Sequence, residues 1–240
     1  MSIPAVKRPR PAAGVPAPVQ TSATVPHTPF ERFAHIVVEG PIGVGKTSLA
    51  RALAQRYGVE LILEAPQENP FLGRFYREGG RWALPTQLHF LFQRIDQIRR
   101  MGEAEQFHAA IVSDFLIDKD ALFARLTLDD EELALYERIA EAQSVHAPTP
   151  DLVIYLQASA PRLAERVARR GLSMERDISP EYLEALSDAY TRFFHHYEAA
   201  PLMIVNTDHL NPVDREVDFE LLLEQLIGMR GRRAFFSLAQ

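Results

Sequence analysis

The chain has no cysteine, and this absence excludes several kinds of chemistry. Without cysteine a protein forms no disulfide, binds no zinc through thiolates and has no thiol nucleophile. An apolar run long enough for a membrane-spanning helix is also missing from the sequence. Basic residues are not in excess: the net charge is −6, which argues against general nucleic-acid binding. We therefore expect a soluble, cytoplasmic protein with no nucleic-acid partner and no membrane partner.

The composition indicates one domain preceded by a tail. The chain has 240 residues, and 47% of them are hydrophobic, which is enough for a full core. Residues 1–30 are different, because they are rich in proline, alanine, valine and threonine and show no helical or strand period. Such a segment buries too little apolar surface to offset its ordering entropy. We predict a disordered, proline-rich tail over 1–30 and a folded domain over 31–240.

From Phe33 onward, apolar runs alternate with helical patterns. The runs expected to form strands are 33–39, 59–64, 109–114, 152–156 and 202–206. Strands that are apolar throughout and separated by helices are typical of a parallel sheet covered on both faces. The sequence therefore predicts an α/β fold with a five-stranded parallel sheet flanked by helices. Ligands are expected at the carboxyl ends of the strands.

The first of these runs leads into a complete phosphate-binding loop. The segment GPIGVGKTS matches the pattern G-x-x-x-x-G-K-[ST], with an apolar strand before it and a helical pattern after it. Glycines let backbone N–H groups close around a phosphate, and the following helix directs its positive end to the same anion. The residues predicted to bind a nucleoside triphosphate are Gly40, Pro41, Ile42, Gly43, Val44, Gly45, Lys46, Thr47 and Ser48. Lys46 supplies charge for the β- and γ-phosphates, and the Thr47 hydroxyl is a ligand for Mg²⁺.

Two carboxylates end the next two predicted strands. Glu64 closes the second strand and Asp114 closes the third. A carboxylate at this position accepts a proton from an attacking hydroxyl or holds Mg²⁺, directly or through water. The alternative is that each is merely a polar residue where a strand reaches solvent. The predicted metal ligands are Thr47 and Asp114.

Two further groups of polar residues fit either a functional or a plain structural role. Gln87 and Arg94 lie two helical turns apart on one face of an otherwise apolar helix, so both would need buried partners. The alternative is a surface helix with Arg94 in a salt bridge. Arg166, Arg169 and Arg170 share one face of another helix. That face is either solvated or part of a lid that neutralises phosphoryl charge.

Taken in order, these segments resemble the deoxynucleoside kinase family. The resemblance rests on GPIGVGKTSLA, the Glu64 strand end, NPFLGRFYREGGRWALPTQLHFLFQR, SDFLIDKDALFA and RVARRG, and it covers nearly the whole domain. It implies a P-loop kinase fold with an arginine-rich lid. It also implies transfer of the γ-phosphoryl of ATP to the 5′-hydroxyl of a deoxynucleoside, with Mg²⁺ as cofactor and a homodimer as the assembly.

The resemblance assigns a role to each matching residue. Glu64 matches the general base, and Tyr76 and Glu175 match the residues at the sugar 3′-hydroxyl. The residues that match the base site are the wall residue Trp82 and the polar residues Gln87, Arg94 and Asp120. The catalytic cations that fit the pattern are Lys46 and the lid residues Arg166 and Arg170. The loop after the last strand, expected around the ATP adenine, is Asn206, Thr207 and Asp208.

One position departs from the family pattern, in which an arginine follows the acid after the third strand. Here Phe115 follows Asp114. Either another arginine such as Arg176 substitutes for it, or catalysis is slower than in the family.

Three rival functions share the phosphate loop. A GTPase would need an N-K-x-D motif, and the segment Asn206-Thr207-Asp208 lacks the lysine. A nucleotide-gated binding protein without transfer activity would lack the base, and Glu64 argues against it. A nucleoside-monophosphate kinase is the nearest rival. For the acceptor we expect deoxyadenosine first, deoxyguanosine or deoxycytidine next and thymidine poor. The preference for a purine rests on the resemblance.

Overall fold

The computed structural model describes residues 27–106, 109–143 and 148–238. The tail predicted over 1–30 therefore lies outside the described residues, except for its last four. Those four enter the fold: the Thr28 hydroxyl caps a 3₁₀ helix, η1 (Pro29–Glu31), by accepting from the backbone N–H of Glu31. Phe30 packs edge-on against Tyr57 at 5.5 Å between ring centroids.

The centre of the molecule is a parallel sheet with six strands in the part of the chain that the structure describes. Their order across the sheet is β2-β3-β1-β4-β5-β6, and every neighbouring pair is parallel. The strands are β1 (His35–Glu39), β2 (Glu60–Ile62), β3 (Ile111–Ser113), β4 (Leu152–Gln157), β5 (Leu202–Asn206) and β6 (Arg233–Phe236).

The five predicted strands are present, and the prediction of five was one too few. The missed strand, β6, lies at the edge of the sheet beside β5. Its four residues alternate between exposed and half-buried, with Arg233 and Phe235 facing solvent. An edge strand of this kind has no continuous apolar run, so the pattern that revealed the buried strands was absent.

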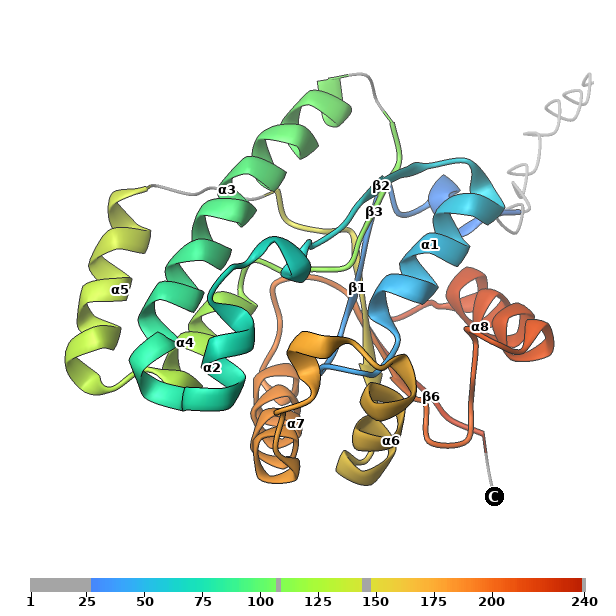
Figure 1. Cartoon of the computed structure of the whole chain (residues 1–240). Coiled ribbons are helices and arrows are strands. Elements are labelled where there is room, and N and C mark those ends of the chain that lie inside the picture. Colours follow the sequence, from blue (N-terminus) through green and yellow to red (C-terminus); the bar gives the residue numbers. More distant parts are fainter. Residues whose placement is uncertain (1–26, 107–108, 144–147, 239–240) are drawn as a thin grey trace, which may run out of the picture.

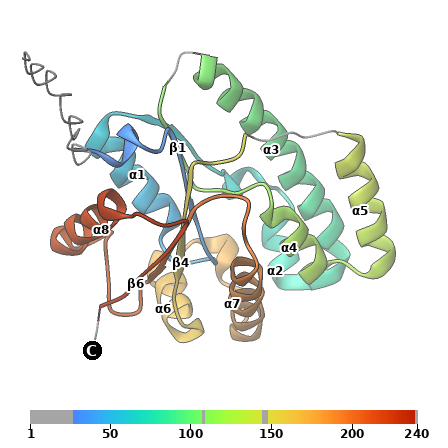
Figure 2. The same ribbon diagram turned by 180° about the vertical axis from the view of Figure 1, so that it is seen from behind.

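Helices cover both faces of the sheet (Figures 1 and 2). They are α1 (Lys46–Tyr57), α2 (Leu72–Glu78), α3 (Ala83–Gln106), α4 (Lys119–Thr127), α5 (Asp130–Ala142), α6 (Ala160–Arg170), α7 (Pro180–His195) and α8 (Glu216–Gly228). Short 3₁₀ helices lie at η2 (Pro66–Glu68), η3 (Gly79–Trp82) and η4 (Ser173–Glu175). Figures 1 and 2 show α1 and α8 together at one side of the molecule, with α3 and α5 at the opposite side.

The alternation of side chains along β1 separates two cores. Ile36 and Val38 point into one core, which contains Leu49 of α1 and Leu222 of α8. Val37 points into the other, where α4 and α7 pack on the sheet. Because both faces of β1 are covered, all five of its residues are buried. The central strand is thereby held rigidly, and it carries the phosphate loop at its carboxyl end.

A third apolar cluster lies away from the sheet, among α2, α3, α4 and α5. It holds α2 and α3 in place beyond the carboxyl ends of β2 and β3, so that a space is left between these helices and the loop after β1. No helix of the described residues is long and apolar enough to cross a membrane.

Candidate active site

The phosphate loop has the backbone shape that its glycines predict. Gly45 has a φ of 108° and precedes the first residue of α1, and Gly40 has a φ of 151°. A Cβ on Gly40 would collide with the carbonyl oxygen of Leu156, so only glycine fits this approach to β4. The Lys46 ammonium donates to the carbonyl oxygens of Gly40 at 2.7 Å and Pro41 at 3.2 Å. The loop is therefore folded around its own lysine, and burial lowers the pKa of Lys46.

The two predicted metal ligands lie in direct contact. The Thr47 hydroxyl donates to one oxygen of Asp114, and the backbone N–H of Glu64 donates to the other at 2.7 Å. Burial raises the pKa of Asp114. The ends of β2 and β3 and the start of α1 thus meet at one point, as the parallel sheet requires. Hydroxyl and carboxylate oxygens are the ligand types that Mg²⁺ prefers, so this pair fits the ion.

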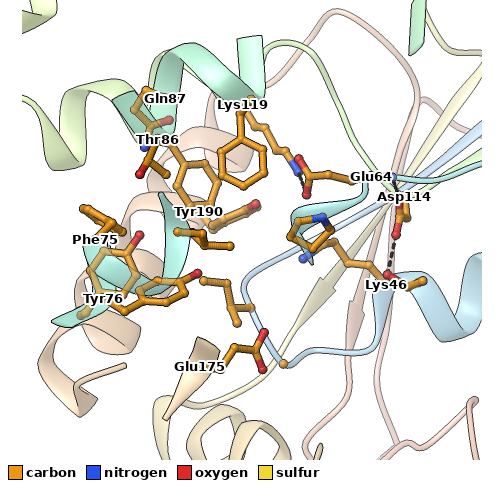
Figure 3. A pocket seen from close by; sticks show the side chains of 18 of the residues that line it. Lys46, Glu64, Phe75, Tyr76, Thr86, Gln87, Asp114, Lys119, Glu175 and Tyr190 are labelled. Carbon is orange, nitrogen blue, oxygen red and sulfur yellow. Dashed lines mark hydrogen bonds and ion pairs between the residues drawn. The ribbon is translucent and has the colours of Figure 1, made fainter. Parts of the chain in front are cut away.

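A cavity of about 800 Å³, including space open to solvent, extends from this point towards α3. Figure 3 shows Lys46 and Asp114 at one end of it and Thr86 and Gln87 at the other, with Glu64 at the phosphate end. The predicted residues that line this cavity are Glu64, Tyr76, Gln87, Arg94, Asp114, Arg170 and Glu175, together with the loop residues Ile42, Gly43, Lys46 and Thr47.

Glu64 is held between two cations. Its Oε1 accepts from Nη2 of Arg94 at 2.7 Å, and its Oε2 lies 3.3 Å from Nζ of Lys119. Burial alone would raise the pKa of Glu64, but the charges of Lys119, Arg94 and Lys46 outweigh it and lower the pKa to about 2. Glu64 is therefore ionised at neutral pH. Its carboxylate lies at the junction of the cavity and the phosphate loop.

The far end of the cavity carries Gln87 and Arg94 from α3. Each side chain belongs to a residue only 4% exposed, so the alternative of a surface helix is wrong. Nε2 of Gln87 donates to the Thr127 hydroxyl at 3.1 Å, and that hydroxyl donates to the Phe123 carbonyl at 2.7 Å. Because the Thr127 hydrogen is already used, this oxygen only accepts, which fixes the orientation of the Gln87 amide. Gln87 keeps its carbonyl oxygen and a second N–H for a ligand.

Asp120 forms an ion pair with Nη1 of Arg94. It lies in a neighbouring hollow between α3, α4 and α5 and does not line the cavity beside Gln87. In this structure, Arg94 is therefore the member of the pair that faces the cavity.

Tyr76 and Glu175 line the same cavity although they are far apart in sequence. Tyr76 comes from α2 and Glu175 from η4, and Figure 3 shows both on the same side of the cavity. Burial raises the pKa of the Tyr76 phenol, so its hydroxyl keeps its proton. Glu175 accepts two hydrogen bonds from Arg170, at 3.0 and 2.5 Å. The resemblance placed both residues at the sugar, and the structure brings them together.

Trp82 does not line the cavity. Its ring stacks on Phe71 with centroids 5.9 Å apart, and its indole N–H donates to Glu78 at 2.8 Å. The aromatic side chains that do line the cavity include Phe75, Phe90 and Phe123, which sequence reasoning missed. Each belongs to a helix with an apolar face, so in the sequence it looks like an ordinary core residue.

The two predicted lid arginines both lie beside the phosphate loop. Arg170 lines the cavity just described and also a second cavity on the outer side of the loop, whereas Arg166 lines only the second one. Arg166 donates to the Val44 carbonyl at 3.2 Å, the Thr207 hydroxyl at 2.9 Å and the Thr207 carbonyl at 2.6 Å. Burial lowers the pKa of Arg166.

The second cavity contains one of the three residues predicted at the adenine. Thr207 lines it, while the side chains of Asn206 and Asp208 accept hydrogen bonds within the loops. Asn206 accepts from the backbone N–H of Asp208, and Asp208 accepts from the backbone N–H of Ser159, both at 2.9 Å. The segment that sequence reasoning missed is 211–214, which also lines this cavity. Its Asn-Pro start marked only a turn in the sequence.

The expected substitute for the missing arginine, Arg176, does not line either cavity. Phe115 is 1% exposed and packs with Ile62 and Ile111 in a core cluster. Arg176 itself is exposed. A further cation near Glu64, besides Arg94 and Lys46, is Lys119, which sequence reasoning did not identify. A lysine at the start of a helix looks like a surface residue, so no signal distinguished it.

A phosphate loop at the end of the central parallel strand, a carboxylate beside it and a cavity on each side define a P-loop phosphotransferase. A family model described as "Deoxynucleoside kinase" matches residues 36–227. Deoxyguanosine kinase of Bacillus subtilis is 34% identical over 192 residues, which are 77% of this chain and 92% of that protein. Deoxyadenosine/deoxycytidine kinase of the same organism is 29% identical over 199 residues, covering 80% and 90%.

Among solved structures, deoxyadenosine kinase from M. mycoides with dCMP and dCDP bound superposes with a TM-score of 0.70 at 24% identity, over 81% of this chain and all of that one. This likeness establishes the fold. The chain belongs to the deoxynucleoside kinase family. It is an enzyme that phosphorylates a deoxynucleoside with ATP, and the three rival functions that share its phosphate loop are set aside.

Proposed function

We propose that Glu64 takes the proton from the 5′-hydroxyl of a deoxynucleoside bound in the first cavity. This proposal is supported by the position of the Glu64 carboxylate, which lies between the phosphate loop and the Gln87 end of the same cavity. As the oxygen–hydrogen bond breaks, the proton passes to Glu64. The electron pair of the 5′-oxygen forms the new bond to the γ-phosphorus. The bond between that phosphorus and the bridging oxygen breaks, and its electron pair leaves with ADP.

The phosphate donor enters from the second cavity, which opens on the other side of the phosphate loop. Thr207 and Arg166 line this cavity, Lys46 lines the acceptor cavity, and Arg170 lines both. Fixed cations around the transferred group stabilise charge in the transition state. Lys46 is suited to this task because its ammonium bonds backbone carbonyls, which a phosphate oxygen can replace.

Thr47 and Asp114 are the residues that would hold Mg²⁺. Across the part of the chain that the structure describes, no group of three His, Cys, Asp or Glu side chains is placed to bind a metal. That agrees with Mg²⁺, which is commonly held by one or two protein ligands together with substrate phosphates and water. When bound, the ion neutralises charge on the phosphate oxygens.

For the acceptor we propose a purine deoxynucleoside, with deoxyadenosine first. The resemblance supports deoxyadenosine, whose exocyclic amine and ring nitrogen match the fixed amide of Gln87. Deoxyguanosine is the second candidate, because Arg94 rather than Asp120 faces the cavity and arginine pairs well with the guanine carbonyl and N7. Both candidates place a polar edge of the base against Gln87 and Arg94.

We also propose a homodimer, as the resemblance implies. Support comes from a hollow between α4 and α7, where the half-buried side chains of Leu126 and Phe193 lie near the charged residues Arg125 and Arg192. Contacts between subunits commonly combine an apolar centre with a polar rim.

Replacing Glu64 with Gln should lower kcat by about 10²–10⁴-fold, the usual loss when a general base is removed. The amide keeps the shape of the side chain, so the fold and ATP affinity should be retained. Single-turnover phosphate transfer measures the chemical step. The matched control is Glu60→Gln, which changes an exposed carboxylate of β2, the strand that precedes Glu64. An unchanged chemical step in Glu64→Gln would reject Glu64 as the base.

Chelation of divalent ions should abolish transfer, because the phosphate charge would lose its counter-ion. Activity should return on addition of Mg²⁺, and Asp114→Asn should raise the Mg²⁺ concentration needed for half-maximal activity by roughly tenfold, by analogy with the loss of a metal partner. Full activity in excess chelator, or an unchanged Mg²⁺ requirement in the variant, would contradict this site.

The ratio kcat/KM should be highest for deoxyadenosine, followed by deoxyguanosine or deoxycytidine, with thymidine lowest. A buried polar group left without a partner by the wrong base costs enough to discriminate strongly. The measurement is initial rates with each deoxynucleoside at saturating ATP. Deoxyguanosine in first place would favour the Arg94 interpretation, and thymidine in first place would reject both.

Sedimentation equilibrium at micromolar concentration should give twice the monomer mass. Phe193→Glu should shift the protein to monomer, since a carboxylate on the apolar face opposes association. The control is His195→Glu, which changes an exposed residue of α7 outside the lining of that hollow. A monomer at all concentrations in the unchanged protein would overturn the proposal.

A further inference from the structure

A buried charge cluster lies directly behind the cavity. Lys119, the first residue of α4, is 2% exposed, and its ammonium lies 3.4 Å from Oε2 of Glu39 and 3.3 Å from Oε2 of Glu64. Glu39 is the last residue of β1 and is fully buried. Figure 3 shows the lysine reaching Glu64 along the side of the cavity opposite Glu175. A lysine is rarely this buried unless it is paired.

Glu39 is held by three hydrogen bonds besides its ion pair with Lys119. Its two oxygens accept from the backbone N–H of Gly40 at 2.8 Å, the backbone N–H of Leu116 at 2.9 Å and the Tyr190 hydroxyl at 3.0 Å. Gly40 is the first residue of the phosphate loop. The cluster therefore joins the loop to Glu64 through the sequence of contacts Gly40, Glu39, Lys119 and Glu64.

This arrangement leaves Lys119 paired at both stages of proton transfer. Before transfer, Glu64 is negative and is held by Lys119 on one oxygen and Arg94 on the other. When Glu64 accepts the proton it becomes neutral and can no longer balance the lysine. Glu39 then remains as the counter-charge, so the ammonium is never left buried and unpaired, which would be costly.

We propose that Lys119 is the positioning residue that orients the Glu64 carboxylate, with Glu39 as its permanent counter-charge. This inference rests on the proposed role of Glu64 as base. Holding Oε2 against rotation keeps the carboxylate directed at the hydroxyl, and small displacements of a reacting group are expensive in rate. Lys119 therefore acts through Glu64, whereas Lys46 and Arg170 act on the phosphates.

The test uses Lys119→Gln and Lys119→Arg in the full chain. Loss of the ammonium should lower kcat about 10- to 100-fold, the scale of a misplaced reacting group, while the KM for the deoxynucleoside changes by less than about threefold. Lys119→Arg should recover most of kcat, because the charge returns. A rise in KM as large as the fall in kcat would overturn the proposal. So would an unchanged kcat in Lys119→Gln.

Two double variants separate positioning from a purely structural role. Lys119→Gln with Glu39→Gln removes the uncompensated buried charge, and it should fold even if Lys119→Gln alone does not. Its kcat should stay low, because Glu64 still lacks its lysine. Recovery of kcat in this double variant would mean that Lys119 serves only to neutralise Glu39, and the proposal would be wrong.

The second double variant is Lys119→Gln with Glu64→Gln. If Lys119 acts through Glu64, this protein should be no slower than Glu64→Gln alone, since effects of coupled residues do not add. A further full drop in kcat would show that Lys119 acts independently of Glu64, against this proposal. An active Glu64→Gln enzyme would instead reject the proposed base itself, so the two failures are distinguishable.

Discussion

The structure of the site depends on the cost of burying the Glu64 carboxylate. Removing an ionised carboxylate from water costs several kcal/mol of free energy unless cations and hydrogen bonds replace its hydration. Arg94 and Lys119 supply that replacement, and each needs a second carboxylate of its own, Asp120 and Glu39. The buried Glu64 carboxylate therefore requires an alternating set of charges contributed by β1, α3 and α4.

The alternation also explains which cation is left for the nucleotide. Arg94 and Lys119 are committed to carboxylates, whereas the Lys46 ammonium bonds the backbone carbonyls of its own loop. A phosphate can displace carbonyl contacts more readily than it can break a buried ion pair. The site thus separates two kinds of positive charge: one kind is paired with the Glu64 carboxylate, and the other contacts only backbone carbonyls of the phosphate loop.

The parallel sheet makes this arrangement possible because it brings the carboxyl ends of its strands together. Glu39, Glu64 and Asp114 end or follow β1, β2 and β3, which are neighbours in the order β2-β3-β1. Their mutual repulsion would oppose this approach if α3 and α4 did not insert Arg94 and Lys119 among them. The position of these two helices is in turn set by the apolar cluster that they share with α2 and α5.

The sequence by itself determined the parallel α/β fold, the phosphate loop and the residues Glu64, Tyr76, Gln87, Arg94 and Glu175 of the cavity. These were readable because buried strands are apolar throughout, because the loop needs glycines at fixed spacing, and because the family resemblance supplied the remaining matches. Only the tertiary structure showed the edge strand β6, the place of Trp82 outside the cavity and the burial of Lys119 between Glu39 and Glu64. Each of these depends on which element packs beside the residue, and a local sequence pattern does not determine which element that is.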